Sequence, residues 1–411
     1  MEKARQQNKM LIAKTKSKKR KKTETRVKKD TKSHYYDYSL VAVIILLTCF
    51  GLIMLYSTSA YTAEIDFGDD MYYFKRQAVI SVACIGAALV ISRIDYHILK
   101  YFTTFLYVIS AVLMLLVKTP LGRSANGARR WLQLGPLPQF QPAEVAKLAV
   151  IVCLAYMVVK MGKQVHTLKA CAVLGGMGGF LAMLAYIFTE NLSTAIIIFC
   201  ITLGMIFVAH PEMKPFIILF AVGIVLIGAF VIFLVTTLDT SDSFRIRRIL
   251  VWLHPEDYAS GDGYQTIQAL YAIGSGGLLG RGLGNSIQKL GSVPEAQNDM
   301  IFSIICEELG ILGGMVVLLL FAYLLYRLFF IAQNAPDMFG SLMVSGIFLH
   351  IALQVVLNIG VVVNLLPNTG VTLPFISYGG TSILFLMAEM GLALSVARQI
   401  TFTEPKDVQL L

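Results

Sequence analysis

Ten long apolar runs constrain this chain more than any other feature of its sequence. An α-helix needs about 20 mostly apolar residues to cross the hydrocarbon core of a bilayer. Runs of roughly this length lie near residues 39–57, 77–92, 97–117, 142–160, 168–188, 192–210, 215–238, 299–326, 338–363 and 370–397. Only 15% of the residues are charged, whereas soluble proteins have about 25%. The sequence therefore predicts an all-α polytopic membrane protein with about ten transmembrane helices.

The net charge of +10 belongs to one segment, residues 1–38. This segment holds 14 of the 35 basic residues and four of the 25 acidic ones, so the rest of the chain is neutral overall. It precedes a membrane span and lacks interleaved aromatic residues, which argues against nucleic acid as a partner. It is also too long and too charged for a cleaved signal peptide. We expect a disordered cytoplasmic tail that sets the orientation and contacts anionic membrane lipids.

Ten spans after a cytoplasmic N-terminus return the C-terminus to the cytoplasmic side. We expect a tail at 1–38, a transmembrane domain at 39–400 and a second cytoplasmic tail at 401–411. The polar segments 118–141 and 239–298 then lie outside, with the longer one between helices seven and eight. Both carry basic residues, namely Arg123, Arg129, Arg130, Arg245, Arg247, Arg248, Arg281 and Lys289. An anionic lipid-linked ligand would explain them, because arginine binds phosphate through two parallel hydrogen bonds. Alternatively, loops of this length cross the membrane regardless of their charge.

A first candidate site opens the fourth apolar run, where the sequence reads Gln141-Pro-Ala-Glu-Val-Ala-Lys147. Ionisable groups at membrane depth are costly and mark functional sites. Glu144 and Lys147 are three residues apart, so they share a helix face and can pair. The pair either locks the end of the helix or lines a polar cavity.

The richest segment is 292–310, where the second polar loop meets the eighth apolar run. Asp299 stands at this junction, and it is either a catalytic carboxylate or the cap of a helix N-terminus. Glu307 and Glu308 follow within the apolar run, and we expect one of them to face a protein interior or a cavity. The six cysteines and six histidines are scattered without metal-ligand spacing, so they indicate no metal site.

Two further segments interrupt the apolar pattern. The run Gly274–Gly284 is dense in glycine but lacks the context of a nucleotide-binding loop, so it predicts a tight loop with close backbone approach. The blocks Leu366–Gly370 and Leu373–Ser382 break the last apolar stretch. Non-helical backbone at membrane depth is tolerated where it lines a cavity, whereas small residues also allow close helix packing.

Together these motifs resemble the SEDS family, which comprises FtsW, RodA and SpoVE. The matching pieces occur in the family's order from about residue 38 to about residue 400. They are Tyr56–Ala60, Asn126–Trp131, Gln141–Lys147, Gly263–Gln265, Ala272–Gly277, Gly282–Leu290, Pro294–Asp299 and Leu373–Ser382. The forms at Asn126–Trp131 and Gly282–Leu290 are more similar to FtsW or SpoVE than to RodA.

The resemblance implies a peptidoglycan glycosyltransferase of the bacterial cell membrane that polymerises lipid II at the outer face. It implies undecaprenyl-pyrophosphate-linked glycan as a substrate and a class B penicillin-binding protein as a partner. Septal synthesis with divisome proteins is the expected setting, and elongation or sporulation is the alternative. The family's catalytic aspartate falls on Asp299. Supporting roles fall on Glu144 and Lys147, and we add as candidates Gln141, Arg129, Arg130, Arg245, Arg248, Lys289, Glu295 and Ser377.

One position departs from the family pattern. Many members carry Pro-Asp-Leu-Gly-Thr at the start of the sixth span, whereas this chain has Glu190-Asn-Leu-Ser-Thr194. Asn191 cannot supply a negative charge, so either Glu190 substitutes for the missing carboxylate or the charge is dispensable here.

The mechanism expected from these residues is a direct displacement. Asp299 would take the proton from the acceptor 4-hydroxyl as it attacks the anomeric carbon of the growing glycan. Pyrophosphate is a good leaving group, and arginine or a divalent cation (Mg or Mn) would neutralise its charge. The alternatives are a transporter that flips lipid II, since broken helices and intramembrane charges suit transport as well, and a scaffold that recruits division proteins.

Overall fold

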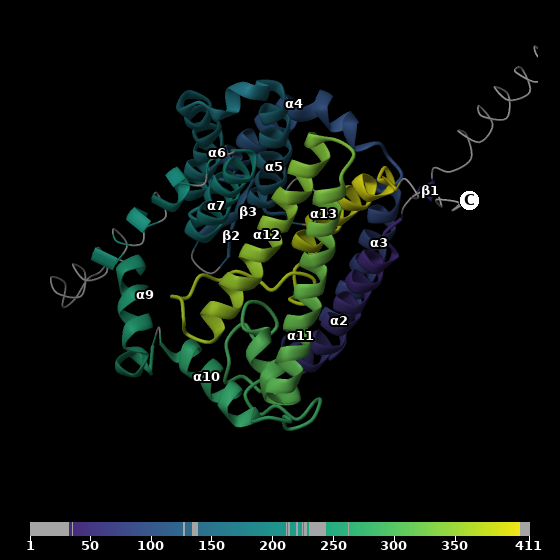
Figure 1. Ribbon diagram of the computed structural model, residues 1–411. Helices are drawn as coiled ribbons and strands as arrows, with labels where there is room; N and C mark the ends of the chain where they lie inside the picture. The colour runs from purple at the N-terminus through teal and green to yellow at the C-terminus, as the bar shows by residue number, and fades with distance from the viewer. Residues whose placement is uncertain are drawn as a thin grey trace, which may run out of the picture.

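The computed structural model describes residues 33–34, 36–125, 128–133, 139–210, 244–261 and 263–402, with shorter pieces between 212 and 229. Within these residues, nine helices are long and apolar enough to cross a membrane. They are α2 (Tyr38–Phe67), α3 (Tyr72–Ile91), α4 (Leu99–Leu116), α5 (Pro142–Met161), α6 (Leu168–Phe188), α7 (Leu192–Ala209), α11 (Ile301–Asn334), α12 (Met338–Val362) and α13 (Gly380–Arg398) (Figure 1). The predicted all-α polytopic class is therefore confirmed.

The predicted span near 215–238 lies mostly outside the described residues, which contain only a short apolar helix there, at Lys214–Gly223. The 1–38 tail falls almost entirely outside them as well. Strand β1 (Ser33–His34) pairs antiparallel with β4 (Thr401–Phe402), so these two strands lie together at one end of the bundle, which we call the terminal end. The stretch between α7 and α9 (Phe244–Leu253) lies mostly outside the described residues.

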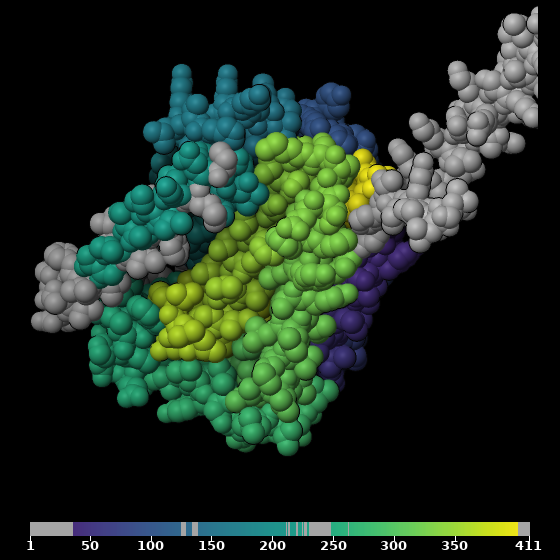
Figure 2. Space-filling model, viewed as in Figure 1, coloured from purple at the N-terminus to yellow at the C-terminus, as the bar shows by residue number. Residues whose placement is uncertain are grey.

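The opposite end, which we call the loop end, carries the long connections. A hairpin of β2 (Gly122–Ala125) and β3 (Ala128–Leu132) lies between α4 and α5. Helix α9, the short helix η3 (Pro255–Tyr258) and α10 (Tyr264–Gly276) lead into the turns before α11. Figure 2 shows the segments around α10 and the start of α11, in green, closing the lower end of the molecule.

The terminal end is held by buried polar contacts. Asp37 caps α2 by accepting from the Leu40 amide at 2.9 Å, and it also pairs with Arg327 near the end of α11 at 2.8 Å. Asp337 caps α12 and accepts from the Tyr96 hydroxyl at 2.6 Å, in η1 (Tyr96–Ile98). A further one-turn helix, η2 (Gly162–His166), joins α5 to α6. These contacts fix the helix ends against one another and leave the loop end as the place for function.

Helices α5, α12 and α13 form the centre of the bundle. In α13, 67% of the residues in the most apolar stretch are buried, whereas the figure for the segment that contains α4 is 17%. Gly346 of α12 lets α5 approach closely, because a Cβ at this position would lie 2.7 Å from Cγ2 of Ile151. Glu144 and Lys147 of α5, His350 of α12 and Glu389 of α13 are therefore enclosed by other helices, whereas most of the surface of α4 is left uncovered by them.

Helix α11 is broken close to the loop end. Gly310 has φ 70° and ψ −173°, and the glycine-dense segment after α10 lies against the break. The amides of Arg281 and Gly282 donate to the carbonyls of Glu307 and Glu308 at 3.0 and 2.9 Å. A Cβ on Gly310 would lie 2.3 Å from the Leu278 carbonyl oxygen, so only glycine fits without a backbone shift. This is the close backbone approach that the glycine content predicts.

Candidate active site

Asp299 lies at the loop end, two residues before α11 begins, and only 9% of its surface is exposed. One side-chain amide, that of Asn358 near the end of α12, holds its backbone in place. The Nδ2 group of Asn358 donates to the carbonyl oxygens of Asp299 and Val371, each at 2.7 Å. Gly370 lies next to the carboxylate, since a Cβ there would be in ordinary contact with Oδ2 of Asp299 at 3.8 Å. The aspartate therefore stands where α11, α12 and the segment after α12 meet.

Its environment gives Asp299 the properties of a base. Burial raises the pKa of the carboxyl group to about 7, and the negative charge of Glu295 acts in the same direction. A hydrogen bond from its own backbone amide and the positive charge of Arg248 oppose this shift. A carboxylate with a pKa near neutrality both ionises and accepts a proton at physiological pH. Asp299 caps no helix in the structure, because α11 has no side-chain cap.

A pocket of about 270 Å³ lies at the loop end, and Arg248, whose charge acts on Asp299, is among the residues that line it. Its lining combines aromatic rings with side-chain amides and one guanidinium. The lining residues are Arg248, Val251, Trp252, Gly261, Tyr264, Gln265, Thr266, Pro294, Asn364 and Asn368. Aromatic faces and amide groups suit a ligand that is rich in hydroxyl groups.

Hydrogen bonds hold the pocket wall together. Arg248 donates to the Asn368 carbonyl at 3.2 Å, and the Asn368 amide donates to Oε1 of Gln265 at 2.8 Å. Trp252 donates its indole N–H to the Asn364 carbonyl at 3.1 Å. The wall therefore joins α9 and α10 to the segment after α12, which follows them by more than 100 residues in the sequence.

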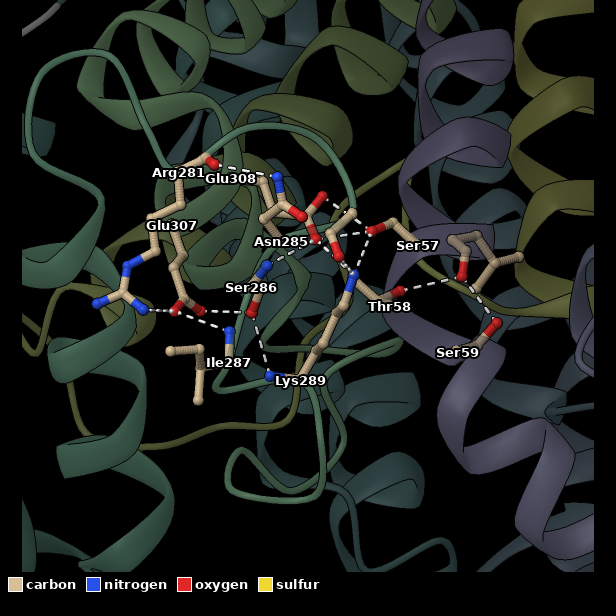
Figure 3. Close-up of polar contacts among 12 residues, drawn as sticks. Ser57, Thr58, Ser59, Arg281, Asn285, Ser286, Ile287, Lys289, Glu307 and Glu308 are labelled. Carbon is tan, nitrogen blue, oxygen red and sulfur yellow. Dashed lines mark hydrogen bonds and ion pairs between the residues drawn. The ribbon is translucent and has the colours of Figure 1, made fainter.

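Glu307 and Glu308 form a second buried cluster beside the break in α11 (Figure 3). Oε1 of Glu308 pairs with Nζ of Lys289 at 2.8 Å, and both groups bond to Oγ of Ser57 on α2. Glu307 accepts from the Ile287 amide at 3.1 Å and from the Ser286 hydroxyl. Figure 3 shows Ser286, Ile287 and Lys289 gathered around the two glutamates, with Ser57 on the opposite side. Lys289 is 9% exposed, so it anchors the loop before Asp299 and is not open to a ligand.

The Glu144–Lys147 pair lies in α5 as the spacing predicts. Nζ of Lys147 is 2.9 Å from Oε1 of Glu144, and their side chains are 2% and 7% exposed. Gln141 occupies the N-cap position in an extended conformation, and Pro142 begins the helix. Oε2 of Glu144 is buried and has no hydrogen-bond partner among the described residues. The pair is therefore buried within the bundle, and one carboxylate oxygen of Glu144 is left to bond to another polar group.

The arginines of the β2–β3 hairpin lie near the start of α7. Arg130 is half-buried and donates to the Glu190 carbonyl at 3.4 Å, whereas Arg129 is exposed. Glu190 pairs with Lys118 at 2.5 Å at the surface. Asn191 caps α7, where its Oδ1 accepts from the Thr194 amide at 3.0 Å. Asparagine and aspartate cap helices equally well, so Asn191 keeps the capping role although the residue differs from the family pattern.

The remaining candidates have different positions. The Ser377 hydroxyl has a structural contact among the described residues. Its Oγ accepts a hydrogen bond from the Leu373 amide at 2.9 Å and closes the turn there. The following amide, of Tyr378, donates to the Gln297 carbonyl at 2.9 Å, which ties this turn to the Asp299 segment. The side chain of Arg245 lies outside the described residues. In the described part of the chain, no group of three or more His, Cys, Asp or Glu side chains could hold a metal ion.

The structure therefore brings Asp299, Glu295 and Arg248 together and places Glu144 and Lys147 separately on α5. It also adds residues that were not among the predicted site residues, namely Asn358, Gln265, Trp252, Asn364 and Asn368. The sequence carries a signal that could have indicated Asn358, because an amide side chain inside an apolar run needs a polar partner.

These features define a polytopic membrane protein with a buried carboxylate and a polar pocket at one end of the bundle. Residues 37–401 match the family described as cell cycle protein, FtsW, RodA and SpoVE, and the chain belongs to that family. Stage V sporulation protein E of Bacillus subtilis is 40% identical over 90% of this chain and 98% of its own length. A probable peptidoglycan glycosyltransferase FtsW of Trichlorobacter lovleyi is 36% identical over 88% and 93%.

Two solved structures have the same architecture. A chain of a peptidoglycan synthase complex that coordinates polymerisation and crosslinking is 28% identical with a TM-score of 0.73, and the match covers 88% of this chain and 98% of that one. The rod shape determining protein RodA of Thermus thermophilus is also 28% identical, with a TM-score of 0.61 over 88% and 97%.

Proposed function

We propose that this protein is a peptidoglycan glycosyltransferase that polymerises lipid II into glycan strands, with septal wall synthesis as its setting. Asp299 carries this proposal, because it is a buried carboxylate with a pKa of about 7 on which Arg248 acts, and Arg248 lines a pocket that suits a sugar. The names of the relatives support the activity, since several are probable peptidoglycan glycosyltransferases at 33–36% identity. The relationship to a sporulation protein keeps a sporulation-specific role as the alternative setting.

In the proposed reaction, Asp299 removes the proton from the acceptor sugar hydroxyl. The resulting oxygen bonds to the anomeric carbon of the donor glycan, and the bond to undecaprenyl pyrophosphate breaks. Trp252 and Tyr264 would stack on sugar rings, and the amides of Gln265 and Asn368 would bind hydroxyl groups. Of the predicted arginines, Arg248 is the one that lines the pocket and acts electrostatically on Asp299, so we assign it to the pyrophosphate.

We further propose that the terminal end faces the cytoplasm and the loop end the outer surface. The basic 1–38 segment enters α2 from the terminal end, and the positive-inside rule places such a segment in the cytoplasm. A class B penicillin-binding protein is the proposed partner, as the synthase complex that resembles this chain combines polymerisation with crosslinking. Divisome proteins and anionic lipids complete the proposed set of contacts.

The test is glycan synthesis from lipid II by the purified protein together with its penicillin-binding partner in detergent. The wild type should give polymer on a gel, and Asp299→Asn should give none while it still copurifies with the partner. Asp257→Asn is the matched control, because Asp257 is an exposed carboxylate of the same loop end. Polymer from Asp299→Asn at the wild-type level would refute the assignment of the base. Monomer alone from the wild type, with lipid II translocated in vesicles, would indicate the transporter instead.

A further inference from the structure

A line of buried polar residues runs inward from Asp299 along α12. His350, Gln354 and Asn358 are spaced four residues apart, so they lie on one face of the helix. They are 1%, 3% and 1% exposed. The outermost of them, Asn358, is the residue that holds the Asp299 backbone. The line therefore begins at the base and extends two helical turns into the membrane.

Each of these three side chains has a buried polar atom without a partner among the described residues. The atoms are Oδ1 of Asn358, Oε1 of Gln354 and Nε2 of His350. In Asn358 and His350, the other polar atom of the side chain is already hydrogen-bonded. Asn358 uses Nδ2 for the carbonyls of Asp299 and Val371, and His350 uses Nδ1 for Glu389 of α13 at 2.9 Å. The free atoms therefore cannot exchange roles with the bonded ones without breaking these contacts.

The spacing of the three residues fits water molecules. Four residues of α-helix rise about 6 Å. A water that bonds to two groups joins atoms up to roughly 5.6 Å apart, because each bond is about 2.8 Å long. One water between each pair of neighbours would donate to the amide oxygens, and at Nε2 it would either donate or accept. The arrangement thus works with either tautomer of the imidazole.

The neighbouring helix adds a further polar group at the same depth. Ile151 of α5 packs on Gly346 of α12. The two helices run in opposite directions, so Lys147 and His350 each lie one turn from this contact toward the loop end. Glu144, whose Oε2 also lacks a partner among the described residues, lies about one turn farther out, near the depth of Gln354. The ammonium of Lys147 at this depth disfavours a metal cation in the same place, so water is the ligand that fits.

We propose that α12 and α5 enclose a file of bound water molecules between His350 and Asn358, and that this file positions Asp299. The waters fix the orientation of the Asn358 amide, and Asn358 then holds the base and the Gly370–Val371 backbone together. Glu389 and His350 form the inner end of the file. Gln354, His350 and Glu389 are thus positioning residues for the proposed glycosyl transfer, on which this inference rests.

Gln354→Leu tests the file, because leucine keeps the volume and removes both hydrogen-bonding groups. The kcat of glycan synthesis should fall about 10- to 100-fold, since a base displaced by about 1 Å loses rate on this scale, while the KM for lipid II stays unchanged. His350→Leu should behave in the same way, and His350→Gln should restore much of the rate. Ser345→Ala is the matched control on α12, as its hydroxyl bonds only to its own helix at Ser341. Unchanged kcat in both leucine variants, with normal unfolding temperatures, would overturn the proposal.

A density map of the wild-type complex at a resolution that resolves water gives a test that needs no variant. Ordered waters between Asn358 and Gln354 and between Gln354 and His350 are expected. A dry interior in which these side chains bond directly to one another would overturn the proposal. If the proposed water file is wrong but the proposed function is right, Asp299→Asn is still inactive. If the proposed function is wrong, Asp299→Asn is active, so the two results are distinguishable.

Discussion

The side-chain amide of Asn358 donates to the carbonyl oxygen of Asp299 at 2.7 Å, from a helix that begins almost 40 residues after the aspartate. The same nitrogen donates to Val371 at 2.7 Å. One buried amide therefore closes the site on two sides. An amide can donate twice from a single nitrogen, and a carboxylate of the same shape cannot donate at all.

Asn358→Asp should therefore abolish most of the activity without changing the volume of the side chain. The new carboxylate would face two carbonyl oxygens and lie close to Asp299, so like charges and lost hydrogen bonds act together. We expect glycan synthesis to fall at least about 100-fold. Copurification with the penicillin-binding partner controls for folding, and a rate within a factor of two of the wild type would contradict the role of Asn358.

The rate of polymerisation should depend on pH through Asp299. Its pKa of about 7 means that the carboxyl group is mostly protonated below this pH and cannot act as a base. The rate should thus fall about tenfold per pH unit below 7 and level off above it. Because the folded-state pKa lies above the usual 3.8, the same group lowers the free energy of unfolding as pH rises between about 4 and 7.

Two variants should move this profile in opposite directions. The charge of Glu295 raises the pKa of Asp299, so Glu295→Gln should shift the midpoint of the rate to lower pH. Arg248 lowers that pKa, so Arg248→Gln should shift the midpoint to higher pH. Rate profiles between pH 5 and 9 measure both effects, and identical midpoints in all three proteins would show that another group limits the rate.

The Lys289–Glu308 pair should stabilise the loop before Asp299 as a unit. Removing one partner leaves an unpaired charge in a buried position, which costs about 3–5 kcal/mol. Lys289→Met and Glu308→Gln should each lower the unfolding temperature in detergent, because each leaves the charge of the other residue buried and unpaired. The double variant should lose less than the sum of the two. Additive losses would mean that the 2.8 Å contact contributes no coupling energy.

Gly310→Ala should be strongly destabilising. The left-handed φ of 70° costs alanine about 1–2 kcal/mol, and its methyl group would overlap the Leu278 carbonyl oxygen. Gly179→Ala in α6 is the matched control, since a Cβ there meets nothing within 4 Å. We expect this control to be neutral or stabilising by up to about 1 kcal/mol. Thermal unfolding compares the two variants, and equal unfolding temperatures would contradict the close approach at Gly310.

Asn191→Asp should leave activity and stability close to those of the wild type. Both side chains accept from the Thr194 amide, which bonds to Asn191 at 3.0 Å. Asn191→Ala should instead cost about 1 kcal/mol through the lost cap. If Asn191→Asp raised the polymerisation rate severalfold, the missing carboxylate would have a catalytic role that capping does not explain.

The sequence by itself determined the class of this protein and the depth of its charged residues. Apolar runs near 20 residues leave no alternative to membrane helices, because backbone groups in lipid must bond within the segment. The resemblance carried by Pro294–Asp299 also predicted Asp299 as the base, and the three-residue spacing predicted the Glu144–Lys147 pair.

Only the tertiary structure decided which residues meet. Asn358 reaches Asp299, Ser57 reaches Glu308, and Arg248 reaches Asn368 across 59, 251 and 120 residues. Periodicity along one helix carries no information on the rotation or neighbours of that helix. Lys289 shows the consequence, because its sequence suggested a ligand for pyrophosphate and its burial against Glu308 makes it an anchor. Packing among α5, α11, α12 and α13 determines which groups the polar residues contact. These contacts in turn set the proton affinity of Asp299.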